Sequence, residues 1–387
     1  MHYILRKESA ITGEKNYEVL ASYDFPLFCG CTNEKEEEDI IAHCEFGIFE
    51  SGSIELLKLI PLDLLYQNGH GAGAVGTLWQ KHHEEFANFL MSFKPKSVLE
   101  IGGGHGKLAK ECLKLDEGLE YTIIEPNSST KDERINYIDG FFEKKALEGK
   151  KFDLIAHSHT FEHIYEPNKF LNECAQMLLD EGGGGVMVFS LPNMQKWLEN
   201  KFVNCLCFEH TLFLSEKILE FLSAKNGFKI LKKHYFGEHS IFYALKIDKN
   251  IKTDKVILEN EFAKNKALFE DMMSFYKEKI DTLNKLLNES TKEIYLFGAH
   301  LFSQFLLYNG LCSAKIKGIL DNDPAKWGKR LYGTQFKVFS PEILKDKSDV
   351  LLILNAGIYN DEIKKGIYND EIKKGILNLN EKIEIIT

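Results

Sequence analysis

Long apolar runs are missing from this 387-residue sequence, since no stretch approaches the roughly 18 uninterrupted apolar residues of a membrane-spanning helix. The first twenty residues also lack a basic region followed by an apolar core and a small-residue cleavage site. Basic blocks are missing too, because 48 Lys and Arg stand against 58 Asp and Glu and no cluster could follow a phosphate backbone. We therefore expect a cytoplasmic protein whose partners include neither a membrane nor nucleic acid.

The sequence also lacks a disulfide framework. The eight cysteines are scattered and do not form a disulfide framework, which fits a reducing compartment. Apolar residues at 44% and charged residues at 27% are ordinary for a globular protein. A chain of 387 residues is too long for one compact core, so two or three domains are expected.

Short apolar segments alternate with helical patterns through the middle of the chain. Strands are predicted at about 96–101, 120–125, 152–157, 185–190, 228–233 and 240–246. Such alternation is typical of an α/β fold with a parallel sheet and helices on both faces. A long charged, amphipathic stretch then predicts one helix or a broken pair, and a second, shorter α/β pattern follows it.

The nine residues GIYNDEIKK occur twice in tandem, at 357–365 and 366–374. Two short copies cannot form a repeat fold, because solenoids need three or more longer units to bury a core. We predict a local duplication that lengthens a surface helix by about two and a half turns. We assign it no catalytic role.

The segment VLEIGGGHGKL, residues 98–108, predicts a buried strand that breaks into a tight turn and a helix. The next strand ends in Glu125, which is placed to accept hydrogen bonds from both hydroxyls of a ribose. A dinucleotide site would need the spacing G-x-G-x-x-G, but no glycine stands at 107. Glu100 would repel a pyrophosphate, and it suits a ligand with a cationic amino-acid part.

This pattern resembles motif I of the class I S-adenosylmethionine-dependent methyltransferases. The resemblance continues at 139–142, whose acid and aromatics match the place where such enzymes hold adenine. It also continues at 152–167, which looks like their fourth strand and the loop after it. It implies S-adenosyl-L-methionine as the cofactor. The residues that it assigns to cofactor binding are Glu100, Gly102, Gly104, Gly106, Glu125, Asp139, Phe141, Ser158, His159 and His163.

The segment 152–167 also raises the question of a metal. His157 and His159 would share one face of a strand, and Glu162 and His163 follow them, so a pair of ligands is geometrically possible. The spacing fixes no third ligand. We therefore predict no metal here.

Domain order narrows the resemblance to the three-domain sugar C-methyltransferases of deoxysugar-nucleotide biosynthesis. It implies an N-terminal segment (1–75) like a degenerate zinc-binding domain, a methyltransferase core (76–250), a linking helix (251–290) and a C-terminal Rossmann-like domain (291–387) that helps to enclose the sugar nucleotide. Its C-terminal matches are Gly298, Asp321, Asp323, Pro324, Lys326, Gly328, Gly333, Ser340 and Pro341. A second dinucleotide site there is the competing interpretation, but the turn at 298–303 lacks the glycines that a pyrophosphate needs.

The N-terminal segment departs from the family pattern. The family binds a structural zinc through two Cys-x-x-Cys pairs, whereas this chain has Cys29-Gly30-Cys31 and a single Cys44. Three thiolates at irregular spacing are a weak tetrahedral signal. We predict no zinc, and the set that could still form an irregular site is Cys29, Cys31, His43 and Cys44.

The catalytic segment departs from the pattern as well. Where the family carries Tyr-His-Glu-His, this chain reads Cys207-Phe208-Glu209-His210. A histidine near neutrality can take a proton, and a neighbouring glutamate can orient it or raise its basicity. We predict Glu209 and His210 as the base and its orienting partner; a helix-start acid beside a packed histidine is the other interpretation. The family's sugar-facing tyrosine has no counterpart at 67–71, so His70 and, on the next helix, His83 are reserve candidates.

The predicted function is methyl transfer from S-adenosylmethionine to a nucleotide-activated or carrier-linked sugar in surface-glycan biosynthesis. C-methylation follows from the resemblance. The alternatives are an N- or O-methyltransferase on a sugar or nonulosonic acid derivative, an NAD-dependent sugar-nucleotide oxidoreductase, and a scaffold that binds the cofactor without turnover. The expected partner is a small-molecule sugar.

Overall fold

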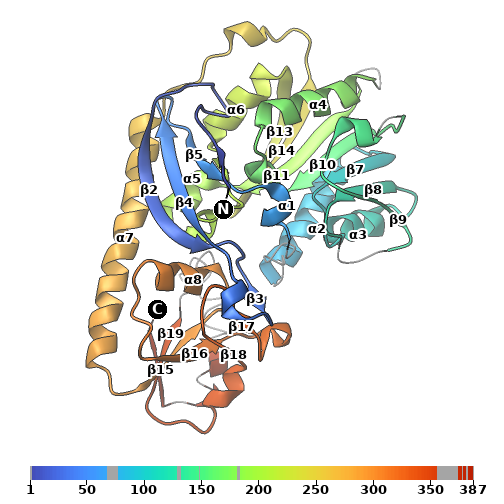
Figure 1. Cartoon of the computed structure of the whole chain (residues 1–387). Helices are drawn as coiled ribbons and strands as arrows, with labels where there is room; N and C mark the ends of the chain where they lie inside the picture. The colour runs from blue at the N-terminus through green and yellow to red at the C-terminus, as the bar shows by residue number, and fades with distance from the viewer. Residues whose placement is uncertain are drawn as a thin grey trace.

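A computed structural model describes residues 2–67, 77–128, 132–147, 149–180, 184–354, 374–376, 378–380 and 382–386. Two α/β parts, each with its own sheet, are joined along one side by a long helix, and the N-terminal strands lie beside that helix (Figure 1). His70 and nearly all of the duplicated GIYNDEIKK segment fall outside the described residues. Among the residues that are described, no helix is both long and apolar enough to cross a membrane.

The larger sheet has seven strands in the order β13-β14-β11-β10-β7-β8-β9. Neighbouring strands are parallel except β14, which is antiparallel to both of its neighbours. All six predicted strands are confirmed to within a few residues, and β9 is an addition. The strands are β7 (Ser97–Ile101), β8 (Glu120–Glu125), β9 (Ile135–Asp139), β10 (Leu154–Ser158), β11 (Val186–Pro192), β13 (Phe228–Phe236) and β14 (Ser240–Ile247).

Helices cover both faces of this sheet, as an α/β fold requires. Leu99 and Ile101 of β7 belong to the core on one face, and Val98 belongs to the core on the other. A strand that is buried on both faces reads as a continuous apolar run, which is why the sequence pattern located β7. The helices are α2 (Thr77–Met91), α3 (Lys107–Leu115), α4 (Pro167–Asp180), α5 (Met194–Glu199) and α6 (Glu216–Lys225).

The N-terminal segment forms an antiparallel sheet together with a strand from the larger domain. Its order is β12-β5-β4-β2, and β12 (Leu212–Phe213) directly follows His210. The loop that carries His210 is therefore fixed to the N-terminal sheet. The other elements of the segment are β1 (Ile4–Leu5), β2 (Tyr17–Pro26), β3 (Cys31–Thr32), β4 (Ile41–Phe49), β5 (Ile54–Leu56), β6 (Lys58–Leu59) and α1 (Leu62–Leu65).

The charged stretch after the larger sheet is one continuous helix, α7 (Phe262–Glu289), of 28 residues. Phe269, Met272, Tyr276 and Ile280 are buried at spacings of three and four, which places them on one stripe of the helix. The helix packs against β2 and β4, and its buried side chains share one core with the C-terminal sheet. Helix α7 therefore packs against both the N-terminal strands and the C-terminal domain (Figure 1).

The C-terminal domain contains a second Rossmann-like sheet, as predicted. Its five strands run parallel in the order β18-β16-β15-β19-β20, and α8 follows β15. The elements are β15 (Glu293–Phe297), α8 (Leu301–Tyr308), β16 (Ile316–Leu320), β17 (Arg330–Leu331), β18 (Val338–Phe339), β19 (Val350–Leu354) and β20 (Ile383–Ile386). Strand β17 pairs outside this sheet with β3 of the N-terminal segment.

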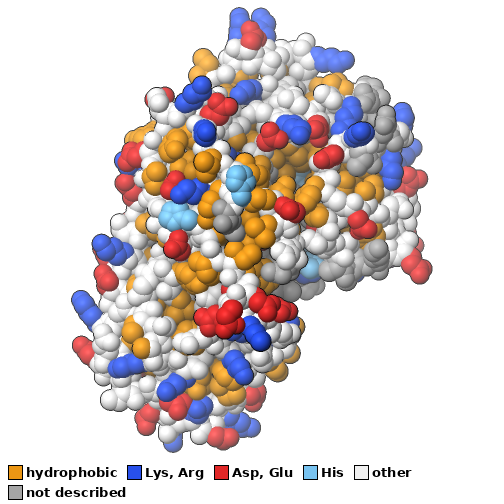
Figure 2. All heavy atoms as spheres, viewed as in Figure 1, with side chains coloured by type: hydrophobic (Ala, Val, Ile, Leu, Met, Phe, Trp, Pro, Cys, Tyr) orange, Lys and Arg blue, Asp and Glu red, His pale blue; other side chains and the backbone are white. Residues whose placement is uncertain are grey.

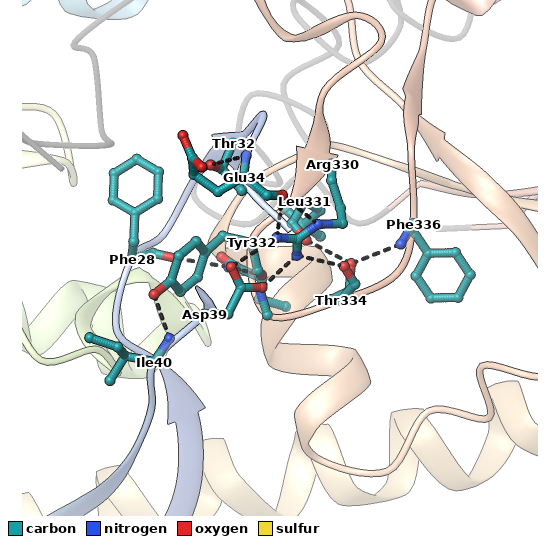
Figure 3. A network of polar contacts seen from close by, with 12 residues as sticks. Phe28, Thr32, Glu34, Asp39, Ile40, Arg330, Leu331, Tyr332, Thr334 and Phe336 are labelled. Atoms are coloured by element: carbon teal, nitrogen blue, oxygen red, sulfur yellow. Dashed lines mark hydrogen bonds and ion pairs between the residues drawn. The ribbon is translucent and has the colours of Figure 1, made fainter. Parts of the chain in front are cut away.

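An ion pair reinforces this β3–β17 junction (Figure 3). The Arg330 guanidinium binds both carboxylate oxygens of Asp39 and donates to the carbonyl of Glu34. The Tyr332 hydroxyl accepts the amide N–H of Ile40 at 2.6 Å. The side chains of Arg330 and Asp39 are only 13% and 3% exposed, so this pair is shielded from solvent, and removal of one partner would leave a shielded charge unpaired.

Charged side chains of both signs are mixed over the visible face of the molecule, and apolar side chains gather in the middle of that face (Figure 2). The N-terminal strands contribute several exposed large apolar side chains. They are Ile4, Leu5, Tyr17, Val19 and Ile41. The outer side of these strands is therefore only partly covered by the described residues.

Candidate active site

A glycine loop connects β7 to α3 and folds back over Glu100. Gly102 has a φ of +80°, a conformation that L side chains rarely adopt. A Cβ atom on Gly103 would lie 2.6 Å from the side-chain carboxyl carbon of Glu100. A side chain at 103 would force the loop or the Glu100 carboxylate to move, because the backbone there lies directly against that carboxylate.

Glu100 is buried, with 3% of its surface exposed. The Tyr121 hydroxyl donates a hydrogen bond to its Oε2 at 2.9 Å. Burial raises the pKa of Glu100 to about 7, against the lowering effect of the Tyr121 hydrogen bond. A buried carboxylate is costly without a positive partner, so this position suits a cationic ligand group.

The two other predicted acids lie at the same edge of the sheet. Glu125 at the end of β8 is paired in register with Asp139 at the end of β9. A Cβ on Gly104 would be 3.5 Å from the Glu125 carboxyl carbon, so the glycine loop and this acid are adjacent. Because ligands of open α/β sheets bind at the carboxyl ends of the strands, these groups fit a ligand that carries a ribose and a cationic amino-acid part.

A cluster of three side chains combines two distant parts of the chain. Glu162 and His163 lie in a short 3-10 helix (Phe161–His163), and His210 lies in the loop before β12. One potential ligand atom from each lies within 4.8 Å of the other two, and the two imidazole rings are 4.9 Å apart. The amide N–H of Thr211 donates to the Glu162 carbonyl at 3.0 Å, so the two loops are joined directly beside the cluster. Among the described residues, this group is the one that could hold a metal ion.

The N-terminal segment holds the His210 loop from the other side. Arg6 donates to the carbonyl of Thr211 at 2.8 Å and to the carbonyl of Tyr165 at 3.0 Å. Its guanidinium is buried and lies 3.3 Å from the Glu55 carboxylate. Strand β5 adds the amide of Leu56, which donates to the same Thr211 carbonyl. The backbone next to His210 is therefore held by two hydrogen bonds from residues 1–60, both to the carbonyl of Thr211.

Tyr66 supplies the tyrosine that the sequence did not reveal. Its hydroxyl lies 3.4 Å from Nδ1 of His163, and its carbonyl accepts a hydrogen bond from Asn127, two residues after Glu125. Burial raises the pKa of Tyr66, and the charge of Glu209 raises it further. The sequence reasoning considered only 67–71 and therefore did not single out Tyr66, which directly precedes that segment.

Glu209 is half-buried and lies near two tyrosines. Its charge contributes to the raised pKa values of both Tyr66 and Tyr165, after the larger effect of burial. His210, its neighbour, is 9% exposed and packs beside Trp197, with ring centres 6.0 Å apart. His210 therefore belongs to the cluster with Glu162 and His163, and the charge of the neighbouring Glu209 acts on Tyr66.

Four further histidines surround Trp79 near the start of α2. His159 has a positive φ of 50° and lies between Ser240, whose Oγ is 2.8 Å from its Nε2, and Glu162, whose Oε1 is 3.4 Å from its Nδ1. Burial lowers the pKa of His159 to about 3. Burial also lowers the pKa values of the other three, His82, His83 and His239. The reserve candidate His83 belongs to this neutral group, since its Nδ1 lies 2.6 Å from the carbonyl of Trp79 in its own helix.

His157 and His159 do not form the pair considered from the sequence. The pairing assumed strand alternation, but β10 ends at Ser158 and His159 adopts a left-handed backbone. His157 instead stacks on Phe189 with ring centres 4.6 Å apart, and burial lowers its pKa to about 3. It is a core residue.

The two aromatic residues predicted near the adenine, Phe141 and Phe142, also lie in different surroundings. Phe141 is 40% exposed, and its ring centre lies 6.1 Å from that of Tyr66 at the mouth of the site. Phe142 packs on Phe170 of α4 at 5.4 Å. Phe141 is therefore the one that a ligand at Glu125 and Asp139 could meet.

The cysteines of the N-terminal segment point in different directions. Cys31 Sγ contacts the carbonyl of Ala299 at 3.6 Å, and the half-exposed His43 contacts Asp24 at 2.9 Å. Cys29 and Cys44 are buried. A hydrogen bond with Cys207 and burial raise the pKa of the Cys29 thiol, and burial raises that of Cys44. Among the described residues, these four side chains do not form a group of three or more potential ligand atoms close enough to hold one ion.

The acid that follows β16 in the C-terminal domain is bound by groups of its own domain. Asp321 follows β16 and accepts hydrogen bonds from the Ala299 amide at 2.8 Å and from Lys326 at 2.9 Å. A dinucleotide site would need this carboxylate for a ribose. Its engagement within the turn argues against a second nucleotide site of that kind.

Residues 75–233 match a family model described as a methyltransferase domain, and residues 247–371 match one described as a C-methyltransferase C-terminal domain. Two curated relatives are named ubiquinone biosynthesis O-methyltransferase. The one from Bartonella tribocorum is 29% identical over 101 residues (24% of this chain, 41% of the relative), and the one from Bartonella quintana is 24% identical over 162 residues (37% and 64%). This chain thus spans less than two thirds of either relative.

A solved structure of an O-methyltransferase family protein from Burkholderia thailandensis is 12% identical, with a TM-score of 0.38, over 45% of this chain and 57% of that one. A score this low carries no weight for the function. The assignment depends instead on the two family models and on the strand-end geometry around Glu100 and Glu125. Residues 75–233 therefore carry a methyltransferase domain, and residues 247–371 carry a C-methyltransferase C-terminal domain.

Proposed function

We propose that this protein transfers a methyl group from S-adenosylmethionine to a carbon atom of a nucleotide-activated or carrier-linked sugar, in the cytoplasm and as a step of surface-glycan biosynthesis. The matched C-terminal domain supports carbon as the acceptor. The observation that carries the proposal is the place of Tyr66, because this residue contacts both halves of the site. Its carbonyl binds Asn127 beside the ribose acid Glu125, and its hydroxyl approaches His163 in the cluster with His210.

The cofactor side is formed by acids at three strand ends. Glu100 would hold the cationic amino-acid part, and Glu125 would hold the ribose, with Asp139 beside it. When bound there, S-adenosylmethionine supplies an electrophilic methyl group on a sulfonium. The glycine loop excludes side chains from the space against Glu100.

The acceptor side must remove a proton and stabilise the charge that results. We assign proton removal to Glu209, which is half-buried beside Tyr66 and Tyr165. If the acceptor carbon is next to a keto group, loss of its proton leaves an enolate, and His163 and His210 are placed to bind the enolate oxygen. The proton stays on Glu209, and the enolate carbon is the atom that receives the methyl group.

The test is a product assay with the full chain. A panel of nucleotide-linked sugars, with and without a keto group, is incubated with S-adenosylmethionine labelled with ¹³C in the methyl group. We expect one member of the panel to gain one methyl group by mass spectrometry, and the NMR spectrum to place the ¹³C on carbon. Glu209→Gln should bind the cofactor normally in calorimetry and form no product.

A ¹³C methyl group on oxygen or nitrogen would favour the O- or N-methyltransferase alternative. Normal cofactor binding without any methylated product would favour the scaffold. Absence of cofactor binding by the wild-type chain would reject the proposal.

A further inference from the structure

The cluster of Glu162, His163 and His210 has the composition of a metal site. The sequence offers Glu162 and His163 as neighbours but no third ligand, and the fold adds His210 from the loop before β12. Their potential ligand atoms lie within 4.8 Å of one another. Two of the three residues are buried and the third is half-buried, so the cluster is unlike an exposed group of acids.

The ligand types indicate which ions would bind. Two imidazoles and one carboxylate on one side of an ion form the arrangement that divalent transition metals accept while positions remain open for another ligand. Metal–nitrogen distances of about 2.0–2.1 Å would require the three side chains to move closer by small rotations. Magnesium and calcium prefer sites made entirely of oxygen, so they suit this cluster less.

The surroundings of the cluster are already fixed. The Thr211 amide binds the Glu162 carbonyl at 3.0 Å, which ties the loop of His210 to the loop of the other two residues. The Tyr66 hydroxyl lies 3.4 Å from Nδ1 of His163, and the Trp197 ring packs beside His210. Such contacts orient metal ligands before the ion arrives.

We propose that Glu162, His163 and His210 bind one divalent transition-metal ion, of the zinc, cobalt, iron or manganese kind, in the active site. Binding of the ion stands on this geometry alone. Its role rests on the proposed function. An enolate oxygen next to His163 and His210 would face the carboxylate of Glu162, and a cation between them would turn this repulsion into attraction. Proton removal remains with Glu209.

The test uses Co²⁺ as the probe and the full chain after removal of metals with a chelator. We expect one Co²⁺ per chain, with visible absorption bands and no thiolate charge-transfer band in the near ultraviolet. Glu162→Gln, His163→Gln and His210→Asn should each weaken binding by about 10-fold or more, as loss of a ligand or of its support does. The control variants are His43→Asn and Cys31→Ser, which alter the N-terminal segment and should bind Co²⁺ like the wild type.

Equal Co²⁺ affinity in the wild type and all three variants would overturn the proposal, as would the absence of binding at about 1 mM Co²⁺. X-ray absorption on the Zn²⁺-loaded wild type avoids any folding defect of a variant. We expect two imidazoles and oxygen neighbours there, and sulfur neighbours would contradict the site. If the ion binds and no acceptor is ever methylated, the metal site stands while the proposed function fails. Full methyl-transfer activity in the metal-free chain would overturn the catalytic role of the ion.

Discussion

The hydroxyl of Tyr66 lies 3.4 Å from Nδ1 of His163, although 97 residues separate them. Tyr66 directly follows helix α1 of the N-terminal segment, and His163 follows the strand β10 in the middle of the larger sheet. Part of the proposed acceptor site therefore lies outside the methyltransferase domain that the family model covers. The substitution Tyr66→Phe removes only the hydroxyl oxygen and therefore tests the importance of this contact.

We expect Tyr66→Phe to lower methyl transfer by about 10- to 100-fold, because the hydroxyl acts beside the proton-removing group. Cofactor affinity should not change, since the ring and the backbone carbonyl remain. Turnover with the acceptor identified in the panel and calorimetry with S-adenosylmethionine measure the two effects. Tyr235→Phe, which removes an exposed hydroxyl that donates to Glu216, is the control and should behave like the wild type.

Glu100 should make cofactor binding depend on pH in a defined direction. Its pKa is raised to about 7, so at pH 6 most copies of the free chain carry a proton there. A cationic ligand favours the carboxylate, so binding at pH 6 should release on the order of one proton, and binding at pH 8.5 should release almost none. Calorimetry in buffers of different ionisation enthalpy measures this. Equal proton release at both pH values, or the same release in Glu100→Gln, would contradict the assignment.

Glu100 should also make the stability of the folded chain depend on pH. Cofactor binding favours its charged form, whereas folding without the cofactor favours its neutral form. A raised pKa means that the folded chain keeps a proton that the unfolded chain releases near pH 4.5. The stabilising contribution is complete below about pH 4.5 and is lost as the pH rises through about 7. Glu100→Gln removes the buried charge, so at pH 8 it should raise the free energy of unfolding by about 1–3 kcal/mol while weakening cofactor binding. Thermal and urea unfolding at pH 5 and pH 8 test this, and no pH dependence of the difference would refute it.

Gly103→Ala should abolish cofactor binding. The new Cβ would lie 2.6 Å from the Glu100 carboxyl carbon, so the loop or the carboxylate must move. Gly184→Ala is the matched control, because a Cβ there meets nothing within 4 Å and its backbone needs no positive φ. Calorimetry should show no heat of cofactor binding for the first variant and wild-type affinity for the second. Comparable affinity in both would show that the loop does not approach the ligand.

The junction between Asp39 and Arg330 should contribute strongly to stability. Asp39→Asn leaves a shielded guanidinium without its charge partner, and we expect a loss of about 3 kcal/mol in the free energy of unfolding. Urea unfolding followed by circular dichroism measures the loss. Glu259→Gln breaks the exposed ion pair with Lys217 and should cause no measurable change. Equal effects of the two substitutions would mean that burial adds nothing to the Asp39–Arg330 pair.

Local signals in the sequence were sufficient to locate the strands and the glycine loop that carry Glu100 and Glu125. Glu100 and Glu125 end two strands that are buried on both faces and therefore read as apolar runs. Strand β9 was not predicted, because Ile135–Asp139 is only partly buried and lacks such a run. Strand alternation predicted that His157 and His159 share one face. This prediction was wrong because the strand ends at Ser158 and His159 has a positive φ.

The acceptor side required contacts between distant segments. Nothing local relates Tyr66 to His163, or His163 to His210, since each pair is far apart in the sequence and meets only in the folded chain. The prediction that names His70 and the one that concerns the GIYNDEIKK duplication fall on residues outside the described ranges, and both stay predictions.

The shared sheet limits how this protein can be divided or recombined. Strand β12 comes from the methyltransferase domain but pairs with β5 of the N-terminal segment. A fragment that begins at residue 77 would keep Glu100 and Glu125 yet lack Tyr66 and the strand that holds the loop of His210. Such a fragment should bind the methyl donor without acting on an acceptor. A chimaera that receives the C-terminal domain of another enzyme would also need to preserve the Asp39–Arg330 pair. The first 66 residues are therefore the part that any exchange of domains must retain.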